Sequence, residues 1–308
     1  MPFPCWLEPS STVFTLMWLP IPLSLLIRGL KGLLSQDNPL EAQHLFTSLI
    51  RFKLVQPNVV TYNIVINGLC KRAHASTAVT LFRYMEEKGC KPDTVTYNTI
   101  IDCLCKCRLV DQALGLFLQM SKKGIMPDVI TCNSLIQGLC DFNRWQDVNQ
   151  LISEMAIRSI SPDVHTFSIL VDAYGKEGMI KDAEDVIESM IQRGHYPNVV
   201  TYNSLMDGYC LEGEVDEALS VLETMKRRGA VPDICTYNIL INGYCKKLRV
   251  DRAVDLFQQL PREGLSPTIY TYNTILQGYF LTGRHVEAQN FFDEKMMLNK
   301  GLKIDMAT

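Results

Sequence analysis

The sequence predicts an all-α fold, a right-handed α-solenoid built from helix–turn–helix repeats with a period of 35 residues. One observation is that the same asparagine recurs in step along the chain. It stands at positions 63, 98, 133, 203, 238 and 273, and Ser168 takes its place in the one gap. A second observation is that two amphipathic helical patterns, and no strand pattern, fill each period. Self-similarity at such a period indicates a stack of structurally equivalent units.

Each repeat is expected to contain two helices with one buried face each. In the second complete repeat, apolar side chains recur at helical spacing. The first set is Tyr97, Ile101 and Leu104, and the second is Ala113, Leu116, Phe117 and Met120. Asp111 suits the N-terminal turn of the second helix, where a short acidic side chain is favourable. Gly124 favours a left-handed cap at its end, and Pro127 prevents the helix from continuing.

The repeats divide the chain into five expected segments. Residues 1–19 are expected to be irregular, 20–58 to form a degenerate repeat, 59–268 to form six repeats of 35 residues, 269–305 to form a seventh with a two-residue insertion, and 306–308 to begin an incomplete repeat. The degenerate repeat has helical patterns at 24–30 and 39–50, with extra residues between them. Units that pack mainly on their neighbours predict one elongated domain.

The N-terminal segment contains an apolar run, Val13–Ile27, that is interrupted by Pro20 and Pro22. A membrane-spanning helix needs about 20 apolar residues. The segment has neither the basic start of a signal peptide nor the arginine-rich pattern of an organelle presequence. We therefore expect an irregular segment and no membrane anchor.

The composition fits a folded chain without disulfides. Of the 308 residues, 47% are hydrophobic and 20% are charged, which excludes a disordered protein. The net charge of −3 differs from the basic balance of many nucleic-acid binders. Five of the eleven cysteines stand at the twelfth position of a repeat and are predicted to be small buried side chains. These are Cys70, Cys105, Cys140, Cys210 and Cys245. The odd total favours a reducing compartment.

One cysteine cluster has the look of a metal site. Cys103, Cys105 and Cys107 alternate along one helical pattern, so their side chains are expected to point to different sides. The sequence has no nearby histidine at zinc-ligand spacing. No metal site is predicted.

The phrases VTYN, VDEAL and the closing PD, repeated in register, resemble those of pentatricopeptide repeat proteins. Residues 199–233, VVTYNSLMDGYCLEGEVDEALSVLETMKRRGAVPD, are similar to that family's consensus over their whole length. Uniform 35-residue units resemble the P class, and NGLCK and the terminal DMAT are similar to fertility-restorer-like members of plants. The resemblance implies a single-stranded RNA-binding solenoid that reads one base per repeat, without a cofactor or small-molecule substrate. Processing factors would be supplied in trans.

The resemblance also implies which side chains read the bases: the fifth and the last residue of each repeat. These are Asn63 with Asp93, Asn98 with Asp128, Asn133 with Asp163, Ser168 with Asn198, Asn203 with Asp233, Asn238 with Thr268, and Asn273 with Asp305. In this family Asn with Asp is associated with uracil and Ser with Asn with adenine, which implies the RNA core U-U-U-A-U-Y-U. The degenerate repeat adds a further pair that resembles the adenine one, Ser24 with Asn58.

Two further sets of residues follow from the resemblance. The second residue of each repeat would pack against base faces: Val60, Val95, Ile130, His165, Val200, Cys235 and Tyr270. Position 13 would approach phosphates through Lys71, Lys106, Lys176 and Lys246, an interrupted stripe. A lysine there can also complement the helix dipole. Similarly, an asparagine near a helix start can be a cap and an aspartate after proline a turn residue. The joint change to Ser168 and Asn198 in one repeat favours base reading.

The sequence contains no catalytic pattern, because its five histidines are scattered and no GxSxG, HExxH or phosphate-loop motif occurs. A binder rather than an enzyme is therefore expected. The alternatives are a protein-binding helical-repeat scaffold and a truncated, nonfunctional member of the family. Localisation in the mitochondrion, with the plastid as the alternative, rests on the resemblance alone.

Overall fold

The computed structural model describes residues 22–35, 38–54 and 56–298, and every regular element in these ranges is helical. The chain divides into two compact units, Met1–Ile160 and Ser161–Thr308. The sequence predicted a single elongated domain, whereas the structure has this division at the end of the third complete repeat. Each unit is a stack of helix pairs, which confirms the helical-repeat fold class.

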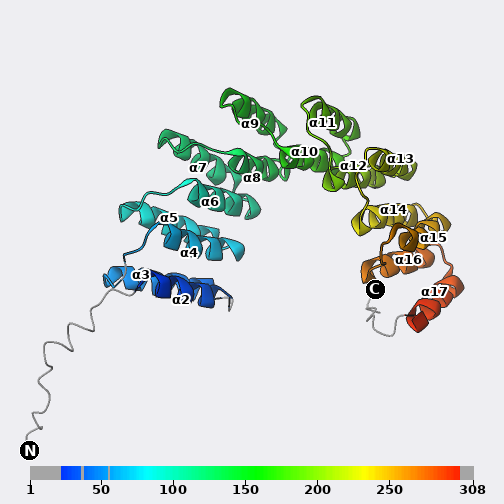
Figure 1. The fold of residues 1–308 in the computed structure, drawn as a ribbon, viewed down its shortest axis with the longest axis horizontal. Helices are drawn as coiled ribbons and strands as arrows, with labels where there is room; N and C mark the ends of the chain where they lie inside the picture. The colour runs from blue at the N-terminus through cyan, green and yellow to red at the C-terminus, as the bar shows by residue number, and fades with distance from the viewer. Residues whose placement is uncertain (1–21, 36–37, 55, 299–308) are drawn as a thin grey trace, which may run out of the picture. The chain divides into compact units, whose positions relative to one another are not determined.

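The described part of the first unit, from residue 22 onward, contains four helix pairs (Figure 1). Its helices are α2 (Leu23–Ser35), α3 (Pro39–Arg51), α4 (Val59–Lys71), α5 (Ala75–Glu87), α6 (Thr94–Lys106), α7 (Val110–Lys122), α8 (Val129–Cys140) and α9 (Trp145–Ile157). Within it, α6 packs against α4, α7 and α8. The first helices of successive repeats therefore stack directly on one another. Helices α2 and α3 lie where the degenerate repeat was expected.

The second unit contains α10 (Val164–Lys176), α11 (Ile180–Gln192), α12 (Val199–Glu212), α13 (Val215–Arg227), α14 (Ile234–Lys246), α15 (Val250–Gln259), the 3-10 helix η1 (Leu260–Glu263), α16 (Ile269–Leu281) and α17 (His285–Leu298). Here α12 packs against α10, α13 and α14. Helix α15 ends early, because Pro261 has no N–H for the α-helical ladder and the chain tightens into η1.

The buried faces are those that the hydrophobic pattern predicts. In the second complete repeat, Tyr97, Ala113 and Met120 are fully buried, and Leu116 is half-buried at the edge of the core. The predicted left-handed caps are also present: Gly124 and Gly229 have φ of 74° and 80°. Hydrophobic burial along one face of each helix therefore holds the pairs together.

A close contact between cysteine and glycine recurs between neighbouring first helices. The twelfth residue of one repeat faces the tenth residue of the next. A Cβ atom at Gly138 would lie 2.8 Å from Sγ of Cys105, and one at Gly278 would lie 2.5 Å from Sγ of Cys245. Because glycine at position ten has no side chain, the adjacent first helices can pack so closely that the cysteine of one contacts the backbone of the other.

Several expectations concern residues that the structure does not describe. They are the irregular segment 1–19, Asp305 with the two-residue insertion, and the incomplete repeat at 306–308. Among the residues described, no helix is both long enough and apolar enough to span a bilayer.

Candidate nucleic-acid interface

The last residue of each repeat is the N-cap of the next repeat's first helix. Asp93 caps α6, Asp128 caps α8, Asn198 caps α12, and Asp233 caps α14. At α8, Oδ1 of Asp128 accepts hydrogen bonds from the backbone N–H of Thr131 at 2.8 Å and from its hydroxyl at 2.9 Å. The cap is therefore this residue, and the asparagine at position five of the repeat, Asn133, lies inside the helix, in its second turn.

The fifth and last side chains of a repeat meet directly in three of the predicted pairs. Nδ2 of Asn63 donates to Oδ1 of Asp93 at 3.2 Å, Nδ2 of Asn98 to Oδ1 of Asp128 at 3.0 Å, and Nδ2 of Asn203 to Oδ1 of Asp233 at 3.3 Å. These pairs are 30 residues apart in sequence. The structure therefore brings them together within each unit, while Asn133 and Asp163 belong to different units.

A threonine that the sequence reasoning missed orients the asparagine amide. The hydroxyl of Thr96 donates to Oδ1 of Asn63 at 2.7 Å, and that of Thr271 to Oδ1 of Asn238 at 2.8 Å. These threonines stand at position three of the next repeat and are fully buried. An Asn amide has two N–H groups and two acceptor lone pairs. Where both contacts form, as at Asn63, one N–H and one lone pair stay available to a ligand.

The pair with serine has different geometry. The hydroxyl of Ser168 donates to the backbone carbonyl of Val164 at 2.9 Å and lies 2.7 Å from the hydroxyl of Thr201. Oδ1 of Asn198 accepts from the N–H of Thr201 at 3.0 Å. Ser168 and Asn198 make no hydrogen bond with each other in the described structure. The shorter serine side chain leaves space that an asparagine would occupy.

A cavity of about 390 Å³ lies beside Ser168. Its lining includes Ser168 and Asn198, together with the predicted stacking residues His165 and Val200. Asp163 lines it as well, so the structure gathers five predicted site residues around one hollow. His195, which the sequence reasoning did not select, also lines the cavity. Its ring centroid lies 5.8 Å from the ring centroid of Phe167.

Two predicted pairs depart from the pattern. At Asn203, Oδ1 is buried and has no hydrogen-bond partner in the described structure, because the Thr236 hydroxyl turns to Asp233. At Asn238, the amide oxygen is held by Thr271, and Thr268 uses its hydroxyl as the cap of α16. No bond joins Asn238 to Thr268 among the residues described. The partner predicted for Asn273 lies outside them.

The aspartates of the three bonded pairs are held as carboxylates. Burial opposes their ionisation, but hydrogen bonds from the following threonine and from the paired asparagine lower the pKa of Asp93, Asp128 and Asp233. A carboxylate that accepts several hydrogen bonds is stabilised in its charged form. Each pair therefore presents a fixed negative charge beside an oriented amide.

The predicted stacking residues at position two are all exposed at the start of the first helices. Val95 exposes 59% of its surface and Tyr270 exposes 56%. Isolated exposed apolar residues are common, but these recur at one position of every repeat. Together with the asparagines they form what we call the reading edge: positions two, five and thirty-five of consecutive repeats.

The predicted phosphate lysines divide into two classes. Nζ of Lys106 forms an ion pair with Asp102 at 2.7 Å, and Nζ of Lys176 forms one with Asp172 at 2.6 Å, each four residues apart on one helix. Lys71 and Lys246 have Asn67 and Asn242 at the corresponding positions and form no ion pair with another described residue. The stripe is therefore uneven in available positive charge, which the sequence reasoning did not anticipate.

A further set of ion pairs links consecutive second helices. Arg144 pairs with Asp111 at 2.5 Å, Arg249 with Asp216 at 2.8 Å, and Arg284 with Asp251 at 2.7 Å. Asp111, which the sequence placed at a helix N-terminus, thus also has an arginine partner from the next repeat. The carboxylates are 68% to 88% exposed, so each pair contributes little to stability.

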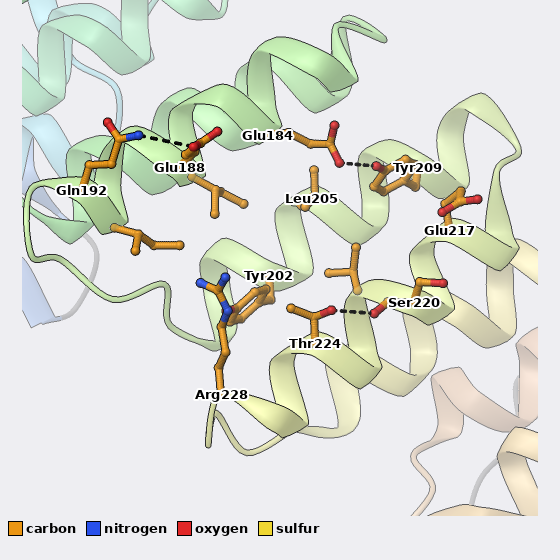
Figure 2. A pocket seen from close by; sticks show the side chains of 13 residues that line it. Glu184, Glu188, Gln192, Tyr202, Leu205, Tyr209, Glu217, Ser220, Thr224 and Arg228 are labelled. Carbon is orange, nitrogen blue, oxygen red and sulfur yellow. Dashed lines mark hydrogen bonds between the residues drawn. The ribbon is translucent and has the colours of Figure 1, made fainter.

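A larger cavity of about 570 Å³ lies between α11 and α13 (Figure 2). Its floor includes Leu205 and its rim Glu184, which accepts a hydrogen bond from the Tyr209 hydroxyl at 2.6 Å. It contains none of the predicted base-reading or stacking residues. Within the described residues there is also no cluster of three or more side chains suited to a metal ion.

The fold and the reading edge define a modular helical-repeat protein of the α-solenoid class. Family models for the PPR repeat family match residues 57–106, 92–141, 127–176, 169–211, 197–246 and 232–280, and a model for the PPR repeat matches residues 270–299. Because these matches cover more than half of the sequence, the chain belongs to the pentatricopeptide repeat family.

Two relatives describe the extent of the similarity. A pentatricopeptide repeat-containing protein of Arabidopsis thaliana is 38% identical over 60 residues, which is 20% of this chain and 9% of the relative. The crystal structure of PPR10 from maize superposes with a TM-score of 0.67 at 26% identity, over 96% of this chain and 47% of PPR10. PPR10 in complex with an 18-nt psaJ RNA element has a TM-score of 0.62 at 24% identity, over 96% of this chain and 44% of that one. The chain spans less than half the length of these relatives.

Proposed function

We propose that this protein binds single-stranded RNA in a sequence-specific manner, with one repeat for each base. The observation that carries the proposal is the reading edge, where an oriented amide and a carboxylate recur with the period of the repeat. A family member with the same fold, maize PPR10, has been crystallised with an RNA element. Repeat proteins that read one base per unit use two or three side chains for each base.

The chemistry of the asparagine pairs suits uracil. Uracil presents the N3–H donor between two carbonyl acceptors. At Asn98, Oδ1 accepts from Thr131 at 2.5 Å and Nδ2 donates to Asp128, so one lone pair and one N–H point elsewhere. The lone pair can accept from N3–H while the N–H donates to a carbonyl. Cytosine has an acceptor at N3, so the fixed amide would meet it with the wrong polarity.

The fourth repeat supports a different base. Ser168 is shorter than asparagine and lines the 390 Å³ cavity, which offers room for a purine. His165 and Val200 flank the cavity and can pack on both faces of one base. Adenine is the proposed ligand, because the hydroxyl of Ser168 can turn toward a ring nitrogen acceptor.

The proposed RNA core, from 5′ to 3′, is U-U-U-A-U-Y-U. The geometry of the sixth repeat, where Thr268 is used as a cap, is consistent with weak discrimination between pyrimidines. We further propose that the protein acts on an organellar transcript, in the mitochondrion or the plastid, by stabilising it or marking it for processing or translation. Cleavage or editing would be left to partners, since the chain itself acts as a binder.

A titration of the purified chain against RNA containing UUUAUUU tests the proposal, with UUUGUUU as the control and two salt concentrations. Preference for the adenine-containing RNA, weakened by salt, is the expected result. The double variant Ser168→Asn with Asn198→Asp should then move the preference at that base to uracil. Equal binding of both RNAs would support RNA binding but refute the proposed base preference of the fourth repeat. An absence of binding by a monodisperse, helical sample would refute the RNA proposal and favour the protein-scaffold alternative.

A further inference from the structure

The first helices of the first two complete repeats carry a thiol pair where three other pairs of consecutive repeats place cysteine against glycine. Position twelve of the first repeat is Cys70 on α4, and position ten of the second is Cys103 on α6. In the series Cys105–Gly138, Cys210–Gly243 and Cys245–Gly278, the same two positions hold one thiol only. The second complete repeat therefore differs from these three pairs, because it has a second thiol, Cys103, where they have glycine.

The three cysteine–glycine pairs indicate how far apart the Cβ atoms of Cys70 and Cys103 lie. A Cβ atom built at the glycine lies 2.8, 3.3 and 3.1 Å from the Cβ of the facing cysteine in the three pairs of that series. Disulfides span about 3.5–4.5 Å between their Cβ atoms. A real Cβ at position ten must move the helices apart by a few tenths of an ångström, which brings the two cysteines into that range.

The side chain of Cys103 already contacts Cys70. Sγ of Cys103 donates a hydrogen bond to the carbonyl oxygen of Cys70 at 3.9 Å, which places its sulfur beside that residue. A second thiol, Cys107, follows one turn later as the C-cap of α6, and its Sγ donates to the carbonyl oxygen of Ala73 at 3.6 Å. The sequence reasoning expected the cysteines of this helix to point to different sides. The structure places Cys103 and Cys107 on the same side.

From this contact we infer that Cys70 and Cys103 form an oxidation site at which a small hydroperoxide converts the two thiols into a disulfide between consecutive repeats. Cys103 is 2% exposed, so the reactant must be as small as hydrogen peroxide. Cys70 is half-buried and stands beside it as the second thiol.

The chemistry balances with one peroxide for each disulfide. The Cys103 thiolate attacks one peroxide oxygen; an S–O bond forms, the O–O bond breaks, and the hydroxide that leaves takes up a proton. Sulfur of Cys70 then attacks the resulting sulfenic acid; the S–S bond forms, the S–O bond breaks, and the departing hydroxide takes the Cys70 proton to become water. Two thiols are oxidised and one hydrogen peroxide is reduced to two waters.

The electrostatics of the cluster favour Cys103 as the attacking sulfur. The neighbouring thiols of Cys70 and Cys107 lower the pKa of the Cys103 thiol, although burial opposes ionisation. The pKa of Cys70 is raised by the neighbouring Cys103 thiol and by burial. The thiolate is the reactive form of cysteine, so the two residues have distinct roles.

The test oxidises the reduced full-length protein with one equivalent of hydrogen peroxide. Intact mass, a thiol count under denaturing conditions and a peptide map then report the product. The expected result is the loss of two of the eleven thiols, a mass lower by two hydrogen atoms, a mapped Cys70–Cys103 bond, and full reversal by dithiothreitol.

The variant Cys103→Gly reproduces the cysteine–glycine contact of the Cys105–Gly138 pair, so its helical content should match the wild type. It should form the disulfide at least tenfold more slowly, as should Cys70→Ser. Cys245→Ser, which removes a cysteine that faces Gly278, is the matched control and should react as the wild type does. The inference is overturned if Cys103→Gly loses two thiols at the wild-type rate. It is also overturned if the wild type gains oxygen without a cross-link, or if the mapped bond joins another pair.

Discussion

Nδ2 of Asn98 donates a 3.0 Å hydrogen bond to the same carboxylate oxygen of Asp128 that caps helix α8. One oxygen atom therefore serves the fifth position of one repeat and the first turn of the next. The single hydroxyl proton of Thr131 has both residues within hydrogen-bonding distance, with Oδ1 of Asn98 at 2.5 Å and Oδ1 of Asp128 at 2.9 Å. Stability and the proposed base choice are linked at this atom.

Substitution of Asp128 separates these two roles. Asp128→Ala removes the cap of α8 and should lower the free energy of unfolding by about 1 kcal/mol. Asp128→Asn keeps a capping oxygen, as Asn198 does at α12, and should cost less than about 0.5 kcal/mol. Both variants should weaken the uracil preference at the second base of the RNA. Chemical denaturation and titrations with single-base RNA variants check this, and an equal stability loss in both variants would contradict the capping role.

The reading edge should lose stability in acid. The folded-state pKa values of Asp93, Asp128 and Asp233 lie below the unfolded value of about 3.9. The folded form therefore binds fewer protons in this range, and its extra stability is complete above the unfolded pKa and lost as the pH falls through the folded values. Thermal unfolding from pH 6 to 3 should show a falling midpoint below about pH 4. Asp128→Asn should make the unfolding midpoint depend less on pH. An unchanged pH dependence would show that the ionisation of Asp128 is not its cause.

Asp102 should weaken RNA binding by neutralising Lys106, with which it forms a 2.7 Å ion pair. Asp102→Asn reproduces the Asn67 and Asn242 that precede the unpaired lysines by four residues, and it should raise the affinity for RNA about two- to fivefold, the worth of an exposed ion pair. Lys71→Ala should lower the affinity and reduce the slope of log affinity against log salt by about 0.7. Titrations at several salt concentrations measure both effects. A fall in affinity on Asp102→Asn would show that Lys106 has no phosphate role.

Two glycine substitutions should have opposite effects on stability. Gly138→Ala places a Cβ 2.8 Å from Sγ of Cys105, between closely packed helices, and should destabilise by about 1–3 kcal/mol. Gly115→Ala lies inside α7 with no atom within 4 Å of the new Cβ and should stabilise by about 0.5–1 kcal/mol. Thermal unfolding of both variants provides the comparison. Similar behaviour of the two would mean that the cysteine contact does not set the spacing of α6 and α8.

The local structure could be predicted because it depends on short-range patterns. Helical spacing of apolar residues places Tyr97 and Ala113 in the core, and Gly124 takes the left-handed conformation that a helix end requires. The pairing of Asn98 with Asp128 could be proposed only through the family resemblance, since the two residues are 30 positions apart.

The remaining features depend on the distance between neighbouring repeats. A buried threonine such as Thr131 looks like a helix-initiating residue in sequence, and its bond to Asn98 appears only when two repeats are stacked. The contact between Cys70 and Cys103 likewise comes from the register of α4 against α6. The division of the array after Ile160 has no marker in the 35-residue pattern, because every repeat there has the same length.

The bridging position of Thr96, between Asn63 and its own cap residue Asp93, bears on how such arrays can be recombined. A graft cut at the start of a helix, between positions 35 and 1, would transfer an asparagine–aspartate pair but leave its orienting hydroxyl behind. The self-contained cassette instead begins before Asn63 and ends after Thr96, so it overlaps two consecutive repeats. Swaps drawn along these offset boundaries should carry their specificity with them, whereas swaps of whole helix pairs would depend on the threonine of the recipient.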